Sequence, residues 1–175
     1  SMSKRIMNEV IVTAERHDMN IYYTDTDSMH IDSGDVPKLA LTYAMKYGRV
    51  LIGKKMGQFH SDFDSKILKG EIYACESIIL GKKCYIDKLT DGETKDEQGN
   101  LIYDYHVRMK GMNKRGIVHR AEMDYDGDLM KVYERLYAGD TLSFDLCGGG
   151  QMPTFDYNKN GTISSKNEFI RKIKF

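Results

Sequence analysis

Two aspartates, Asp25 and Asp27, stand two positions apart in a short polar stretch between strand-like segments, Asn20–Thr24 and Ser28–Asp32. In that spacing their Cα atoms lie about 7 Å apart. Two carboxylates at that distance repel by about 2 kcal/mol at an effective dielectric of 20. A divalent cation relieves the repulsion, and hard oxygen ligands favour Mg²⁺ or Mn²⁺, especially where phosphates complete the shell. An ordinary polar hairpin turn is the alternative, because Asp and Thr are common turn residues.

The whole string Tyr23–Ser28 (YTDTDS) resembles the YxDTDS motif, motif C, of family B DNA polymerases. In that family the motif is a hairpin of the palm domain. The resemblance implies that Asp27 is a ligand of the catalytic metals and that Asp25 lies beside them as a supporting acid. It also implies two-metal transfer of deoxynucleotides to a primer, with Mg²⁺ or Mn²⁺ as the cofactor.

A second string, Lys83-Cys84-Tyr85, follows about 55 residues later and resembles the KxY motif of the same family, which holds the primer terminus. A lysine pairs with a phosphate as a point charge, and a tyrosine can donate a hydrogen bond or stack. Lys82 could share the contact. Taken without motif C, the string indicates no more than a solvated strand end.

Further similarity extends along nearly the whole chain, although only motif C is specific. Gly57-Gln58-Phe59 and Lys110-Gly111-Met112 are similar to steps found in the protein-primed branch, whose members are organellar and viral. That branch implies replication associated with a virus, a plasmid or an organelle. The family's DxxSLYP-like motif A and KxxxNSxYG-like motif B are missing, and no room remains for an exonuclease.

The missing motifs imply that the chain is the C-terminal part of a longer polymerase. We expect the end of the palm at 1–110 and a thumb at 111–175. The rest of the polymerase, primer–template DNA and a deoxynucleoside triphosphate would be its partners. Alone, the chain is expected not to polymerise nucleotides, because one pair of carboxylates cannot hold two metal ions.

One stretch, 105–121, has a strong positive bias and contains no acid. A thumb that grips a DNA backbone needs such a surface, whereas a solvated face balancing acids elsewhere is the alternative. The five cations assigned to DNA binding are Arg108, Lys110, Lys114, Arg115 and Arg120.

Composition sets broader limits. Lysine plus arginine and aspartate plus glutamate both number 26, so any nucleic-acid binding must come from local patches. The three cysteines form no CxxC pair, which argues against a disulfide scaffold or a four-cysteine zinc site and fits an intracellular protein. No apolar run approaches the roughly 20 residues of a membrane helix.

The expected fold is α+β, with an antiparallel palm-type sheet, packed helices and a small α+β thumb. Hydrophobic spacing predicts helices at 3–17, from about 35 to 50, and after 126–128 as far as Gly139. The expected strands are 20–24, 28–32, 57–64, 70–80, 83–89 and 101–110, with a mobile surface loop at 90–100 and further strands near the C-terminus.

Two other functions were weighed. One is a non-catalytic DNA-binding or replication-accessory module that keeps a degenerate palm. The other is a calcium protein, because 156–168 resembles the start of an EF-hand loop. That loop has Asn167 at its twelfth position and lacks flanking helices, so a hairpin turning at 158–161 is expected instead. A metal site joining His30 and Asp32 to the motif C acids is disfavoured, because these acids share no strand face.

Overall fold

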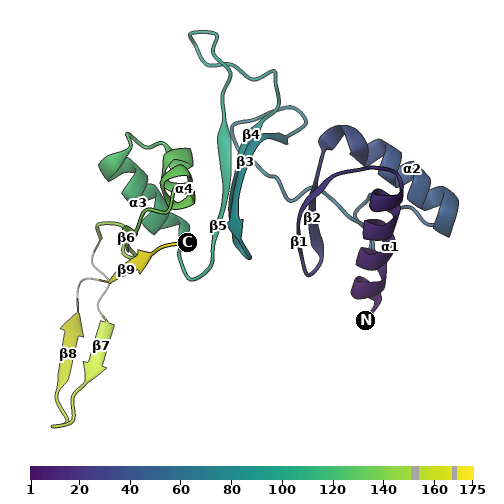
Figure 1. Ribbon diagram of the computed structural model, residues 1–175. Helices are drawn as coiled ribbons and strands as arrows, with labels where there is room; N and C mark the ends of the chain where they lie inside the picture. Colours follow the sequence, from purple (N-terminus) through teal and green to yellow (C-terminus); the bar gives the residue numbers. More distant parts are fainter. Residues whose placement is uncertain (151–153, 167–168) are drawn as a thin grey trace. The chain divides into compact units, whose positions relative to one another are not determined.

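A computed structural model describes residues 1–150, 154–166 and 169–175. It is α+β, as the sequence predicts, with helices interleaved among antiparallel strands (Figure 1). Contacts divide the chain into two units, 1–64 and 65–175. The predicted boundary at residue 110 falls inside the second unit, where residues on both sides of it share one core. In the described part of the chain, no helix is both long and apolar enough to cross a membrane.

The first unit packs two helices against a hairpin. It contains α1 (Met2–Arg16), β1 (Ile21–Asp25), β2 (Ser28–Ile31), a 3₁₀ turn (Ser33–Asp35) and α2 (Val36–Tyr47). Its core is formed by Ile6, Val10, Ala14, Met19, Leu39, Tyr43 and Leu51. The helix predicted at 3–17 and the hairpin predicted at 20–32 are confirmed within one or two residues.

A polar cluster around Glu9 ties the two helices of this unit together. The buried Tyr43 hydroxyl donates to Glu9 Oε2 at 2.8 Å, and Arg49 forms an ion pair with the same oxygen. Burial first, and then the hydrogen bond to Glu9, raise the pKa of Tyr43 to about 12. The tyrosine therefore stays a neutral donor at physiological pH, and α1 and α2 form a fixed support for the hairpin.

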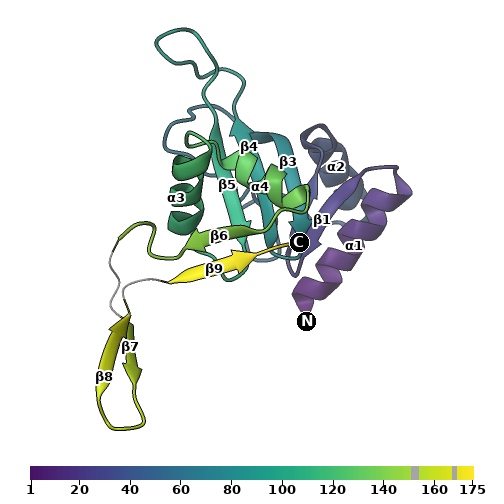
Figure 2. The ribbon, with the colours of Figure 1, turned by 60° about the vertical axis from the view of Figure 1, so that its left-hand side comes forward.

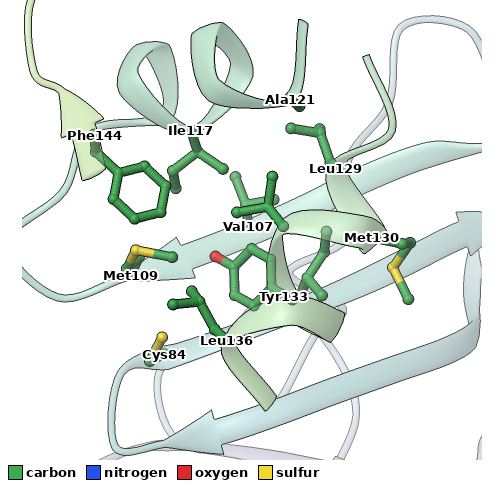
Figure 3. Close-up of a cluster of buried hydrophobic side chains, with 12 residues drawn as sticks. Cys84, Val107, Met109, Ile117, Ala121, Leu129, Met130, Tyr133, Leu136 and Phe144 are labelled. Atoms are coloured by element: carbon green, nitrogen blue, oxygen red, sulfur yellow. The ribbon is translucent and has the colours of Figure 1, made fainter. Parts of the chain in front are cut away.

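The second unit is built on a three-stranded antiparallel sheet in the order β3 (Tyr73–Gly81), β4 (Cys84–Thr90) and β5 (Asp104–Met109). Two helices, α3 (Lys114–Asp124) and α4 (Leu129–Tyr137), pack beside it (Figure 2). Figure 3 shows Ile117, Tyr133, Leu136 and Phe144 converging with Val107 in the core. The buried Tyr133 hydroxyl donates to the Arg108 carbonyl at 2.8 Å, which fixes α4 to β5.

Two further strand pairs follow. β6 (Leu142–Asp145) pairs with β9 (Ile170–Ile173), and β7 (Thr154–Tyr157) pairs with β8 (Ile163–Lys166) in a hairpin. The predicted hairpin turning at 158–161 is confirmed, since Gly161 N–H donates to the Asn158 carbonyl at 3.0 Å. Strands rather than helices therefore flank this turn, as expected for a hairpin and not for an EF-hand. Asn167, the twelfth position of the EF-hand comparison, lies outside the described residues.

The strand predicted at 57–64 is wrong. This segment is a loop that folds back on 51–53: Phe59 N–H donates to the Leu51 carbonyl at 2.8 Å, and Gly53 N–H donates to the Phe59 carbonyl at 2.9 Å. Gly57 has a φ of +83°, which breaks the extended backbone that a strand needs. A single bridge between Ile52 and Phe59 is all that remains of strand pairing there.

The polar loop predicted at 90–100 is anchored at its start by a buried carboxylate. Asp91 Oδ1 accepts from the backbone N–H groups of Glu93 and Thr94 at 3.0 and 2.8 Å. Its Oδ2 accepts from those of Lys69 and Gly70 at 3.0 and 2.9 Å, and from the Thr94 hydroxyl. The Thr94 hydroxyl, followed by these backbone donors, holds the pKa of the Asp91 carboxyl well below its usual value of 3.8.

We expect Asp91→Asn to lower the melting temperature at pH 7 by several degrees, because an amide offers one acceptor oxygen in place of two. A carboxyl whose pKa is lowered on folding stabilises the protein above the unfolded pKa and loses that contribution as pH falls below about 4. Melting temperatures of the two proteins should therefore converge towards pH 2. A difference that is constant from pH 7 to pH 2 would contradict the account.

Candidate functional site

The two aspartates of the YTDTDS string occupy the tip of the β1–β2 hairpin. Asp25 is the last residue of β1 and lies opposite Ser28, the first residue of β2. Thr26 and Asp27 therefore form a two-residue turn. The Asp25 side chain is half-buried and Asp27 is exposed. The predicted tight turn between two strands is confirmed at this position, and Asp27 is the more accessible of the two acids.

The turn carries backbone strain between the two acids. Thr26 has a φ of +45°, in the left-handed region that favours glycine, and a β-branched residue is rare there. Such a conformation costs about 1–3 kcal/mol and is concentrated at functional sites. The Thr26 hydroxyl donates to Asp25 Oδ1 at 3.3 Å, and the Ser28 hydroxyl donates to the Asp25 carbonyl at 3.2 Å. These contacts hold the Asp25 end of the turn.

Side chains of β1 and β2 pack together behind the turn, and one of them binds a neighbouring acid, Asp32. The rings of Tyr23 and His30 meet edge to face, with centroids 5.5 Å apart. The Tyr22 hydroxyl donates to the carboxylate of Asp32, 3.1 Å from Oδ2. Among residues 1–150, 154–166 and 169–175, no three Asp, Glu, His or Cys side chains gather as a metal site would require. The hairpin thus offers two carboxylates, which is part of a ligand shell for a hard cation.

In the second unit, Lys83 and Tyr85 stand on either side of Cys84, the first residue of β4. Lys83 lies in the β3–β4 turn with a φ of +57°. Tyr85 is 9% exposed, stands opposite Arg108 on β5, and packs its ring against His106 at 5.8 Å between centroids. The buried Asp87 supports this face, because its Oδ2 lies 3.1 Å from His106 Nδ1. Tyr85 is thereby packed against β5, opposite Arg108.

Four of the predicted cations line one recess, which we call the basic cavity. It has a volume of about 290 Å³. Lys110 N–H donates to the Lys83 carbonyl at 2.9 Å, which brings the β3–β4 turn to the end of β5. The basic residues that line this cavity are Lys83, Arg108, Lys110 and Lys114, and its apolar floor is formed by Val107, Met109, Met112 and Ile117. Because Val107 and Met109 are buried in the core, strand alternation directs the exposed Arg108 side chain to the other face of β5, beside Tyr85.

Among the described residues, three of the four cations that line the basic cavity have no acidic partner. Over the described parts of the chain, Arg108, Lys110 and Lys114 form no ion pair with an acidic side chain. Like charges crowded around a recess raise the local concentration of anions. The arrangement suits an anionic ligand with several phosphate oxygens, each of which can accept from these donors.

Other cations predicted to bind DNA lie away from this recess. Arg120, near the C-terminal end of α3, pairs with Asp124 at 2.6 Å. Arg115 lies against a glycine loop, where a Cβ on Gly148 would stand 2.5 Å from Arg115 Cγ. Lys82 is exposed in the β3–β4 turn but does not line the basic cavity. The positive stretch is therefore not one continuous surface.

Sequence reasoning did not single out Arg171 on β9. Its Nη1 donates to the Gly111 carbonyl at 2.8 Å, across 60 residues of sequence. Strand alternation places Arg171 on the same face as the half-buried Ile173, which is the one signal in the sequence that this cation points towards the body of the unit.

Comparison with models of protein families gave no match, and neither curated proteins nor solved structures gave one. Functional inference therefore rests on the residues and their geometry.

Proposed function

We propose that this chain is the C-terminal part of a DNA-directed DNA polymerase of family B, containing the end of the palm and the thumb. The observation that carries the proposal is the two-residue turn Thr26-Asp27, strained at Thr26, between the paired residues Asp25 and Ser28. This turn presents the carboxylates of Asp25 and Asp27 at the end of a hairpin. An ordinary polar turn has no need of a β-branched residue at positive φ between two acids. The YxDTDS string adds specificity, because it resembles motif C along its whole length.

In the proposed reaction a primer 3′-hydroxyl attacks the α-phosphate of a deoxynucleoside triphosphate and pyrophosphate leaves. A Mg²⁺ or Mn²⁺ ion held at the hairpin would supply positive charge for the attacking and leaving oxygens. The exposed Asp27 would be the principal metal ligand of this chain. The half-buried Asp25, which accepts from Thr26, would support the site electrostatically. Further ligands and the nucleotide-binding lysine would come from the motif A and motif B regions of the longer polymerase.

The second unit would hold the primer–template. Lys83, Arg108, Lys110 and Lys114 supply cations for backbone phosphates, and Tyr85 beside Arg108 would contact the primer strand at the rim. Contacts of this kind fix register without reading sequence, as replication requires. The same chemistry is expected whether the parent serves a virus, a plasmid or an organelle.

A non-catalytic DNA-binding module with a degenerate palm is the second candidate. This candidate is favoured because the hairpin offers two carboxylates and, among the described residues, no third one to complete a metal site. It predicts the same DNA binding but no need for a cation. A DxxSLYP-like string encoded upstream of this chain would decide for the polymerase.

The test of the proposal on the chain itself is Mn²⁺ binding at the hairpin. We expect Mn²⁺ to broaden the backbone amide signals of residues 24–29 in a ¹⁵N-labelled sample, with affinity of about millimolar, since two carboxylates fill only part of the shell. Asp27→Asn should abolish the broadening and Asp25→Asn should reduce it. Asp32→Asn is the matched control, because that carboxylate is engaged by Tyr22. Broadening that survives Asp27→Asn would contradict the proposed metal site.

A further inference from the structure

The C-terminal strand brings a cation to the wall of the basic cavity. β9 pairs with β6, and Arg171 stands opposite Phe144, a fully buried residue of the core. Ile173, two residues later, packs against the same core. Because residues two apart on a strand share a face, Arg171 is directed towards the unit and Lys172 away from it. The docking of β9 thus fixes the place of the Arg171 guanidinium.

The absence of a side chain at Gly111 leaves the space that the Arg171 guanidinium occupies. Gly111 lies between Lys110 and Met112, both of which line the basic cavity. A Cβ at Gly111 would stand 2.2 Å from Arg171 Nη1, and the φ of +74° also favours glycine there. The guanidinium therefore lies directly on the backbone of the segment that forms the cavity wall, in space that only a glycine leaves open.

Arg171 retains most of its hydrogen-bonding capacity in this position. A guanidinium has five N–H donors in a planar fork that matches phosphate oxygens. The Gly111 carbonyl takes one of these donors. No acidic side chain pairs with Arg171 within the residues that the structure describes. A guanidinium in this position, bonded to the residue between Lys110 and Met112, fits a phosphodiester.

We propose that Arg171 is a phosphate-binding residue of the same site, and that the docked C-terminal strand completes the grip of the basic cavity on a nucleic-acid backbone. This inference rests on the proposed DNA-binding role of the cavity and adds a partner element to it. The β3–β4 turn and the end of β5 contribute one set of cations, and β9 contributes another from the far end of the chain. Undocking of β9 would remove Arg171 and weaken binding without changing the cavity itself.

The test is the affinity of the 175-residue protein for a fluorescent primer–template duplex, measured by anisotropy from 0.05 to 0.3 M salt. We expect Arg171→Ala to weaken binding about five- to tenfold at 0.1 M salt and to reduce the magnitude of the log–log salt slope by about 0.9, the value for one lost phosphate contact. Lys172→Ala is the matched control, with the same charge change on the same strand but the opposite face, and it should change affinity less than about twofold.

A second variant separates the position of Arg171 from its charge. Gly111→Ala keeps every cation but displaces the guanidinium, so it should reproduce most of the loss, and the double variant should be no worse than Arg171→Ala. Circular dichroism melts would confirm that each variant is folded. If the unaltered protein binds the duplex but Arg171→Ala behaves like Lys172→Ala, this inference is overturned and the proposed function stands. If the unaltered protein binds no duplex at all, both are overturned.

Discussion

Reversing the charge of the basic cavity should weaken duplex DNA binding by at least about a hundredfold at 0.1 M salt and remove most of its salt dependence. Four phosphate contacts predict a log–log slope of about −3.6 for the unaltered protein, at about −0.9 per contact, and Arg171 would bring it to about −4.5. Repulsion from the new acids adds to the lost attraction. The variant carries Lys83→Glu, Arg108→Glu, Lys110→Glu and Lys114→Glu.

The control for this experiment carries the same change in net charge elsewhere on the second unit. It reverses four exposed or ion-paired cations that do not line the cavity, including Arg120, which pairs with Asp124. We expect its affinity to fall less than about fivefold, through long-range charge alone. Equal losses in the two proteins would show that DNA binds through bulk charge and not at the cavity. The control substitutions are Lys95→Glu, Arg120→Glu, Lys131→Glu and Arg135→Glu.

The hairpin could be predicted from sequence because everything that shapes it is local. Strand-like residues stand on either side of Asp25-Thr26-Asp27, and three intervening residues leave room only for a tight turn. Helix α4 is equally predictable from local sequence, because an aspartate precedes it and apolar residues recur on one face. In the structure Asp128 caps the helix by accepting from Met130 N–H. The left-handed conformation of Thr26 could not be foreseen, since the residue type argues against it.

The sequence shows that residues 105–121 are rich in cations, but it does not show which of these cations share one surface. Strand β5 exposes alternate residues, whereas α3 turns about 100° per residue, so cations close in sequence diverge in space. Helix α3 itself gave no clear pattern. Gly116 lies inside it, where a Cβ would stand 2.9 Å from the Asp145 carbonyl oxygen. The glycine that weakened the helical pattern is therefore required by close packing against β6.

Contacts across long sequence separations were beyond prediction. In the sequence, Asp91 is one of several acids in a polar stretch. In the structure, its carboxylate accepts hydrogen bonds from the backbone N–H groups of residues 69 and 70, more than 20 positions earlier. Arg171 reaches Gly111 in the same way. No local pattern encodes either partner, because each depends on how the strands are ordered in the folded unit.

The largest effect is expected at the hairpin, measured in the longer polymerase that we propose contains this chain. Asp27→Asn should reduce the rate of nucleotide incorporation about a thousandfold or more, because it removes an anionic metal ligand where the transition state gains charge. Asp25→Asn should reduce it about ten- to a hundredfold, as expected for a group that supports a metal ligand. Both variants should bind primer–template with nearly unchanged affinity. Mn²⁺ should restore activity to Asp25→Asn better than to Asp27→Asn.

The most direct measurement is the single-turnover rate of nucleotide incorporation by these two variants of the complete enzyme, at saturating primer–template and with Mg²⁺. The proposed site predicts that Asp27→Asn is effectively inactive and that Asp25→Asn retains a measurable rate at least tenfold higher. Equal losses would show that both carboxylates ligate the metal directly. An Asp27→Asn enzyme that incorporates nucleotide at the unaltered rate would contradict the assignment of this hairpin as a catalytic metal site.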